Sequence, residues 1–167
     1  MAPAIAQGAE LGVTTAGAMG SYTIRFVKQM RAMGLKVQMR EDLHTRRLAG
    51  YFKPPMTIAL DPNVAHRGEA YHEYRHYIQF KTIARGNIRV DRAMYNDNPD
   101  YFEMLAQRDT YNWLRKQPDV PEFYLQAHYQ HWQEHYERWM ASGGRVPRYE
   151  DYATPWEKLR GRLFGLW

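Results

Sequence analysis

The sequence predicts an α+β fold in which a small three-stranded sheet packs on long helices. Three short segments of strand character lie close together between residues 35 and 60. After about residue 67, apolar residues recur every three or four positions, as on one face of a helix. Strands that precede a run of long helices, rather than alternating with them, are typical of the α+β class.

The strands follow a first helix that is expected to run from an N-cap at Ser21 to Gly34. Residues 35–40 (LKVQMR) alternate apolar and polar side chains, which predicts a strand with one solvated face. Residues 50–55 (GYFKPP) form a second strand or a turn, because the two prolines prevent a helix. Residues 56–60 (MTIAL) are a short apolar run and predict a third strand.

Three longer helices are expected in the second half of the chain. The first covers residues 67–84 and stops at Gly86, and a loop connects it to a second over residues 98–116, which begins at an Asn-Pro-Asp sequence. The third covers residues 121–141 and ends at a pair of glycines. Its expected buried face is a stripe of large side chains spaced by four and three, namely Leu125, Tyr129, Trp132, Tyr136 and Trp139.

The chain length suits a single domain with extensions at both ends. Residues 1–20 are rich in Ala and Gly and predict an N-terminal arm. Residues 21–141 form the predicted domain. Residues 142–167 are an aromatic and basic tail, with one short helix after Pro155, that is expected to pack on the domain or on a partner chain.

Composition excludes several classes of site and partner. The chain has no cysteine, so it has no disulfide and no thiolate ligand, and a metal ion would be held by nitrogen and oxygen. The net charge is +5, but the basic residues are scattered rather than clustered, which makes nucleic acid an unlikely partner. Residues 1–20 read neither as a signal peptide nor as a membrane span, so we expect no membrane-spanning segment.

The stretch YHEYRHYIQF at residues 71–80 contains the pattern H-E-x-x-H. On a helix, His72 and His76 are four residues apart and share one face, so both imidazoles can bind one ion. Glu73 lies beside that face, where its carboxylate can act as a general base. The alternative is a solvated helix face with two ordinary histidines. Arg75 stands between the two histidines, and we expect its side chain to point away, toward an acidic neighbour.

The next predicted helix offers a third ligand. Glu103 follows His76 by 27 residues, in the run NPDYFEMLAQ, and a catalytic zinc site needs three protein ligands. Its alternative role is to compensate the dipole at the start of that helix. The strand at residues 56–60 is expected to form a sheet edge above the metal, to which an extended peptide could add.

A second pattern competes with the first. HWQEH at residues 131–135 reads as H-x-x-E-H, with His131 and His135 as ligands and Glu134 as base, and His128 continues the same row. Few acidic residues follow it to supply a third ligand, so we favour a row of solvated or aromatic-packed histidines. The donor that would stabilise an oxyanion stays open among four candidates, namely Tyr95, Tyr101, Tyr111 and His128.

H-E-x-x-H at residues 72–76, followed by E-x-x-A at residues 103–106, resembles the gluzincin pattern of the zincin metallopeptidases. The order of sheet and helices over residues 21–117 is similar to the compact ImmA/IrrE-type domains. The form H-E-x-x-H-x-x-Q, with Asn-Pro before the third ligand, resembles short zincin-like proteins of bacteria and their phages. The resemblance implies a minimal zincin-like fold.

By this resemblance, His72, His76 and Glu103 would bind Zn²⁺ and Glu73 would be the catalytic base for hydrolysis of a peptide or protein substrate. The alternative is a structural component of a larger assembly, such as a phage virion or secretion apparatus, with a vestigial or structural metal site. In that case the arm and the tail would contact other chains. The expected location is the cytoplasm or a phage particle.

Overall fold

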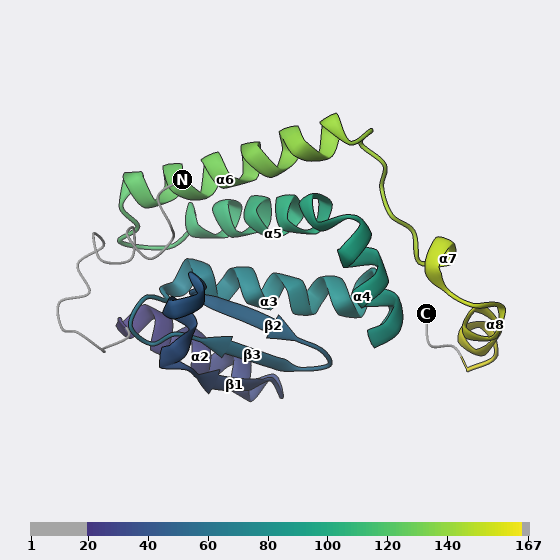
Figure 1. Ribbon diagram of the computed structural model, residues 1–167. Coiled ribbons are helices and arrows are strands. Elements are labelled where there is room, and N and C mark those ends of the chain that lie inside the picture. Colours follow the sequence, from purple (N-terminus) through teal and green to yellow (C-terminus); the bar gives the residue numbers. More distant parts are fainter. Residues whose placement is uncertain (1–19, 165–167) are drawn as a thin grey trace.

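The computed structural model describes residues 20–164 (Figure 1). Residues 1–19, which form nearly all of the predicted arm, and residues 165–167 lie outside the described part. The elements follow in the order α2 (Ser21–Ala32), β1 (Lys36–Met39), a 3₁₀ helix η1 (Glu41–Arg46), β2 (Gly50–Lys53), β3 (Thr57–Leu60), α3 (Arg67–Thr82), α4 (Ile88–Asp97), α5 (Pro99–Leu114), α6 (Glu122–Ala141), α7 (Tyr149–Tyr152) and α8 (Pro155–Phe164).

The predicted α+β fold is confirmed. The three strands form one mixed sheet in the order β1-β3-β2, with β1 parallel and β2 antiparallel to the central strand β3. Helices α2 and α3 pack on the sheet, α5 packs on α3, and α6 packs on α5, so the helices form successive layers above the sheet (Figure 1). None of the helices within residues 20–164 has the length and apolar composition needed to cross a membrane.

Burial of the apolar face of the sheet explains the first layer. Ile58 and Leu60 of β3 are completely buried, and they pack with Met30 of α2 and Ala70 of α3. This removes their apolar surface from water, worth about 1.5–3 kcal/mol for each large side chain. Helix α2 ends as predicted at Gly34, which has a φ of +90°. Its N-cap is Gly20 rather than the predicted Ser21, which is the first helical residue.

The antiparallel packing of α5 on α3 is fixed at three points along the two helices. Near the start of α3, the ring of Tyr71 stacks on Trp113, with centroids 4.3 Å apart. One turn later, Arg75 forms an ion pair of 2.5 Å with Asp109, so its side chain has the acidic neighbour that we expected. Near the end of α3, the amide of Gln79 donates to the carbonyl of Phe102 at 2.9 Å.

The segment between α3 and α5, expected to be a loop, is helix α4. Asn87 is its N-cap, and its side-chain oxygen accepts a hydrogen bond of 3.1 Å from the main-chain N–H of Val90. Val90 and Met94 lie four residues apart, and both are completely buried against Phe80 and Phe102. The helix therefore closes the gap between the ends of α3 and α5.

The predicted buried stripe of α6 is wrong. Tyr129 and Tyr136 are about two-fifths exposed, whereas Tyr124, Ala127 and His128 are buried. Helix α6 packs mainly on α5 alone, so the face that it buries is narrow. The stripe lies at the margin of this face, where its rings contact aromatic side chains of α5.

The C-terminal helices lie beside α4 at one end of the molecule (Figure 1). Glu157 of α8 accepts hydrogen bonds from Asn87 at 2.8 Å and from the Nε of Arg89 at 3.0 Å. It also accepts a bond of 2.7 Å from the main-chain N–H of Thr154. The hydrogen bond from Arg89, together with those from Asn87 and Thr154, outweighs the opposing effect of burial and lowers the pKa of Glu157 to about 2.

We expect Glu157→Gln to destabilise the protein by about 1 kcal/mol at pH 7, since the ion pair lies at the surface. The folded-state pKa is depressed, so the carboxylate stabilises the fold above its ordinary pKa near 4.3 and loses this effect as the pH falls towards about 2. Urea denaturation of both proteins between pH 7 and pH 3 measures this. Glu137→Gln, at an exposed position, is the control. A difference that stays constant over this range would contradict the prediction.

Candidate metal centre

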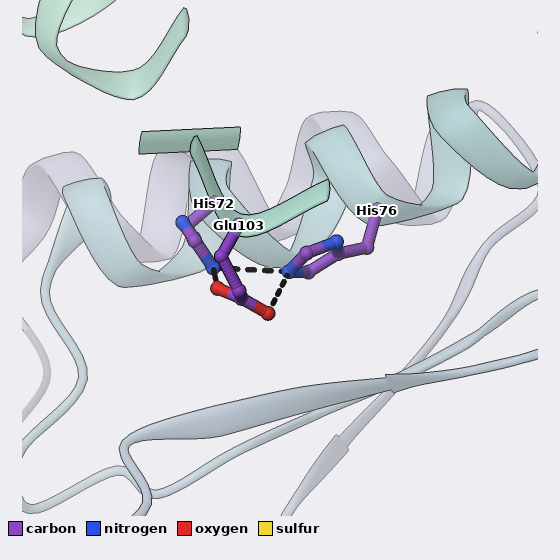
Figure 2. A group of neighbouring side chains, drawn as sticks. All are labelled: His72, His76 and Glu103. Atoms are coloured by element: carbon purple, nitrogen blue, oxygen red, sulfur yellow. Dashed lines mark hydrogen bonds and ion pairs between the residues drawn. The ribbon is translucent and has the colours of Figure 1, made fainter. Parts of the chain in front are cut away.

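Two imidazoles of α3 point to the same place (Figure 2). The helix begins at a capping box in which the main-chain N–H of His66 donates to Glu69 at 2.9 Å. One turn into the helix, His72 and His76 lie on one face, and their rings pack edge to face with centroids 4.7 Å apart. Their Nε2 atoms are 3.0 Å apart. The structure thus brings the two histidines together as the spacing predicts.

Helix α5 adds a carboxylate to this pair. One oxygen of Glu103 lies 3.1 Å from the Nε2 of His72, and the other lies 3.3 Å from the Nε2 of His76 (Figure 2). The three side chains therefore place their ligand atoms within 4.8 Å of one another. Glu103 is the fifth residue of α5, and it points across to α3 instead of capping its own helix.

The dimensions of this triangle fit a metal ion. A tetrahedral ion with bonds of about 2.0–2.1 Å to nitrogen and oxygen holds its ligand atoms about 3.3–3.4 Å apart. The observed separations of 3.0, 3.1 and 3.3 Å are close to this value. Three protein ligands also leave one coordination position open. This buried His-His-Glu group could bind a metal ion.

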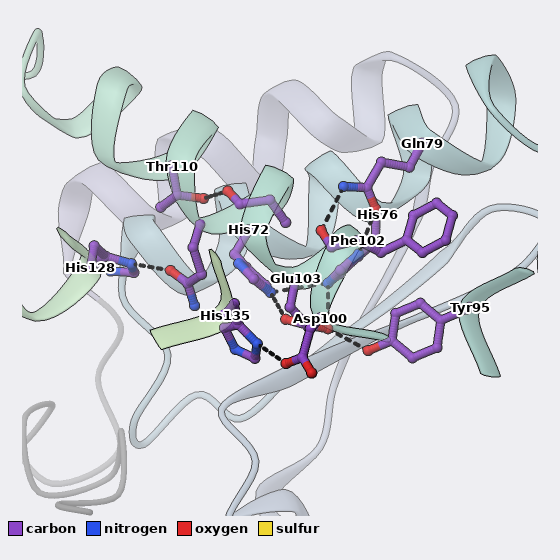
Figure 3. Close-up of polar contacts among 12 residues, drawn as sticks. His72, His76, Gln79, Tyr95, Asp100, Phe102, Glu103, Thr110, His128 and His135 are labelled. Atoms are coloured by element: carbon purple, nitrogen blue, oxygen red, sulfur yellow. Dashed lines mark hydrogen bonds and ion pairs between the residues drawn. The ribbon is translucent and has the colours of Figure 1, made fainter. Parts of the chain in front are cut away.

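Gln79, one turn after His76 on α3, orients the imidazole of His76. The carbonyl of Phe102 can only accept, so the amide nitrogen of Gln79 faces it and the amide oxygen faces His76 (Figure 3). That oxygen lies 2.9 Å from the Nδ1 of His76 and accepts a hydrogen bond from its N–H. The lone pair of a neutral His76 is then on Nε2, the atom that faces the other two ligands. His72 has no such partner at Nδ1 within the described residues.

The charges within the group reinforce one another. Burial alone would lower the pKa of His76, but the nearby Glu103 carboxylate outweighs this effect and raises that pKa to about 9. Burial would likewise raise the pKa of Glu103, but the positive charge of His76 keeps it well below its ordinary value. The Glu103 carboxylate thus stabilises a positive charge between the two imidazoles, and a divalent ion can supply that charge in place of a proton.

Glu73 lies between α3 and the sheet. It is 9% exposed, and the main-chain N–H of Phe52 donates a hydrogen bond to its carboxylate. Burial raises its pKa, which the two neighbouring histidines partly offset. A Cβ atom on Gly50 would lie 3.1 Å from the Cγ of Glu73 and only 2.9 Å from the carbonyl oxygen of Ala59. The absence of a side chain at Gly50 therefore lets β2 approach α3 at this residue.

A pocket of about 550 Å³ opens beside these residues. It is bounded by β2, α3, α4, α5 and α6, and His72, Glu73, His76 and Glu103 all line it. Its sheet side is the edge strand β2. The expectation that residues 56–60 form this edge is wrong, because β3 is the central strand and has a neighbour on both sides.

The main-chain groups of β2 alternate between its partner strand and the pocket. The carbonyl of Ala49 accepts from Asp61 at 2.8 Å, on the side of β3, whereas the N–H of Phe52 points to Glu73. Because successive residues of a strand face opposite sides, Gly50 and Phe52 direct their main-chain groups toward the pocket.

Helix α4 supplies the opposite wall. The hydroxyl of Tyr95 donates a hydrogen bond to Glu103 (Figure 3). Burial and the Glu103 carboxylate both raise the pKa of Tyr95, so its hydroxyl keeps its proton. Asp91 lines the same wall, and burial raises its pKa to about 6.

The second histidine row does not form a metal site. The Nδ1 of His135 lies 2.8 Å from a carboxylate oxygen of Asp100, and the Nδ1 of His128 lies 2.8 Å from the amide oxygen of Gln107 (Figure 3). Among the side chains that the structure describes, no group of three His, Asp or Glu residues other than His72, His76 and Glu103 places its ligand atoms close enough to share an ion. The preference for an ordinary histidine row is consistent with these contacts.

The pocket narrows the choice of oxyanion donor. Tyr95 and His128 line it, whereas Tyr101 packs on Phe102 and Trp139, and Tyr111 packs on aromatic rings of α6. His131 also lines the pocket, although the sequence pattern suggested only a metal-ligand role for it. Burial lowers the pKa of His128 to about 4 and also lowers that of His131. Both imidazoles are therefore neutral at pH 7.

Comparison of the chain with protein-family models, curated proteins and solved structures finds no match. The functional assignment therefore rests on the geometry of the site.

We expect metal content to depend on the three converging side chains. Purified protein should carry about one divalent ion per chain, and His72→Ala, His76→Ala and Glu103→Gln should each remove most of it. Gln79→Ala should weaken binding by about 10–100-fold, because His76 loses its orienting partner. His135→Ala is the control and should retain the metal. Elemental analysis by mass spectrometry measures this, and equal content in all variants would contradict it.

Tyr124 and His128 of α6 pack directly against the main chain of Gly68, which leaves no room for a side chain there. A Cβ atom there would lie 2.2 Å from the hydroxyl of Tyr124 and 2.7 Å from the Nε2 of His128. We expect Gly68→Ala to destabilise the fold by about 1–3 kcal/mol through overpacking, although Ala is normally the better helix former. The penalty should shrink in a Tyr124→Phe background, which removes the closest atom. Urea denaturation of the four proteins measures this, and an unchanged or stabilised Gly68→Ala protein would contradict it.

Proposed function

We propose that this protein is a zinc-dependent metallopeptidase-like hydrolase that cleaves peptide bonds. The observation that carries the proposal is the convergence of His72, His76 and Glu103, with Glu73 beside them, on one pocket that runs along a free strand edge. This convergence supports the resemblance to zincin-like metallopeptidases, which rests on the pattern of the same four residues.

Zinc suits the donor set. Two imidazole nitrogens and one carboxylate are the ligands of many catalytic zinc sites, and the chain offers no thiolate. A bound zinc ion would supply Lewis acidity and lower the pKa of a coordinated water. The same donors hold ferrous iron in some oxygenases. The buried carboxylate of Glu73 next to the ligands favours hydrolysis, because hydrolysis needs a base to accept a proton from water.

Glu73 would carry the proton through the reaction. Its carboxylate accepts a proton from the attacking water while the water oxygen bonds to the carbonyl carbon of the substrate. The carbon–nitrogen bond then breaks, and Glu73 passes the proton to the leaving amine. The hydrogen bond from the N–H of Phe52 holds the carboxylate at the wall of the pocket.

Strand β2 would bind the substrate as an extended chain. The outward-facing N–H and carbonyl of Gly50 and the carbonyl of Phe52 offer hydrogen bonds to a peptide that adds to the sheet, while the N–H of Phe52 is bonded to Glu73. Tyr95 and His128 line the pocket and are the candidates to donate to the developing oxyanion, and His131, which also lines it, is a third. The hydroxyl of Tyr95 carries one proton, which it donates to Glu103, so Tyr95 would have to release that hydrogen bond in order to donate to the oxyanion.

The alternative proposal is a structural protein of a phage particle or secretion apparatus with a vestigial site. The retained Glu73, the pocket and the free strand edge favour an enzyme, because a purely structural metal site needs none of them. The cytoplasm or a phage particle remains the proposed location.

We expect Glu73→Gln to retain the metal and to lose peptide cleavage by at least about 100-fold, since the amide cannot accept the proton. A mixture of quenched fluorescent peptides serves as substrate, and elemental analysis checks the metal. Glu134→Gln, in the second pattern, is the matched control and should keep full activity. Cleavage by Glu73→Gln at the unchanged rate, or a wild-type protein that binds zinc and cleaves no peptide, would overturn the proposal.

A further inference from the structure

Helix α8 has one face that is held by the body of the protein. Glu157 binds Asn87 and Arg89 at the start of α4. Gly161, four residues later on the same face, is buried, and it lines a hollow beside the same loop together with the flanking Trp156 and Arg160. These contacts fix which side of α8 points outward.

The outward side is apolar, with Trp156 at its margin beside the hollow. Trp156 and Leu163 are each 65% exposed, and Leu159 is 46% exposed. Their spacing of three and four residues places the three side chains in one stripe along the helix. In Figure 1, α8 lies at the edge of the molecule, next to the end of the described chain. The stripe has no protein layer above it within residues 20–164.

Positive charge borders this stripe on both sides. At 3.6 residues per turn, Arg160 follows Trp156 around the helix, and Arg162 and Lys158 precede Leu159. No carboxylate in the described part of the chain forms an ion pair with any of these three cations. The helix's only acidic residue, Glu157, is already paired with Arg89. The outward half of α8 therefore combines apolar rings and chains with uncompensated cations.

We propose that α8 binds the surface of an anionic phospholipid membrane, lying in the plane of the interface. An amphipathic helix with aromatic and leucine side chains flanked by Lys and Arg binds in this way, with its apolar stripe among the acyl chains and its cations at the phosphates. Long basic side chains at the border of the stripe can reach the headgroups while their stems stay in apolar surroundings.

The size of the stripe argues against a second copy of the chain as its occupant. A stable protein interface buries about 800 Å² on each partner and needs a complementary shape. Three side chains on a helix of ten residues cover much less than this, whereas a lipid surface requires no matching shape. The basic border also opposes the approach of an identical, equally charged helix.

The proposal does not depend on peptidase activity. Arg89, which binds α8, belongs to the same helix as Tyr95 and Asp91, which line the pocket. Membrane binding through α8 would therefore hold the candidate metal centre close to the lipid surface.

Sedimentation of the full chain with vesicles tests this. We expect binding to vesicles of phosphatidylcholine and phosphatidylglycerol to be at least about tenfold stronger than to phosphatidylcholine alone, and to weaken with salt. The double variant Leu159→Ser, Leu163→Ser should lose about tenfold or more. Arg160→Gln and Arg162→Gln should each cost roughly fivefold.

The matched control removes similar exposed apolar surface elsewhere. Phe123 and Met140 of α6 are 48% and 50% exposed, and Phe123→Ser with Met140→Ser should leave vesicle binding unchanged. Circular dichroism checks that each variant is folded. Absent binding, equal binding to both vesicles, or equal loss in the control would overturn the proposal. Self-association that the Leu159 and Leu163 variant abolishes, without vesicle binding, would overturn it in favour of a second copy.

Discussion

The packing of α5 on α3 is the constraint on which the candidate site depends. Glu103 would be costly to bury alone, because a carboxylate loses its hydration in the protein interior. It is stabilised by two imidazoles of α3, and it meets them only because the two helices are held in register. The stacking of Tyr71 on Trp113 and the ion pair of Arg75 with Asp109 fix that register.

The order of the elements and the ligand group follow from local patterns in the sequence. The four-residue spacing of His72 and His76 places both side chains on the same face of a helix. Asn-Pro marks the start of the helix that carries Glu103. In the sequence, Gln79 stands out only as the last residue of the pattern H-E-x-x-H-x-x-Q. Its orienting role depends on the carbonyl of Phe102, 23 residues away, which fixes its amide. A contact of that range leaves no trace in the local pattern.

Three features escaped prediction for related reasons. Helix α4 is short, and the partners of its buried residues Val90 and Met94 come from α3 and α5, so its apolar residues gave little signal alone. The edge position of β2 depends on strand order, which neither strand's sequence specifies. The exposed side of Tyr129 and Tyr136 depends on α6 having α5 as its main neighbour. Each is decided by tertiary packing rather than by local propensity.

The neighbours of each histidine, rather than its own chemistry, decide its charge. His76 faces a carboxylate, and its pKa rises to about 9. Burial lowers the pKa of His128 to about 4, and the Glu69 carboxylate, 4.0 Å from its Nε2, offsets this only in part. One wall of the pocket is thus arranged to hold positive charge, and the other presents neutral imidazoles that can donate or accept a hydrogen bond. A cation held at the first wall would leave the second free to contact a polar substrate, and this division of roles follows from where α5 places Glu103 and Gln107.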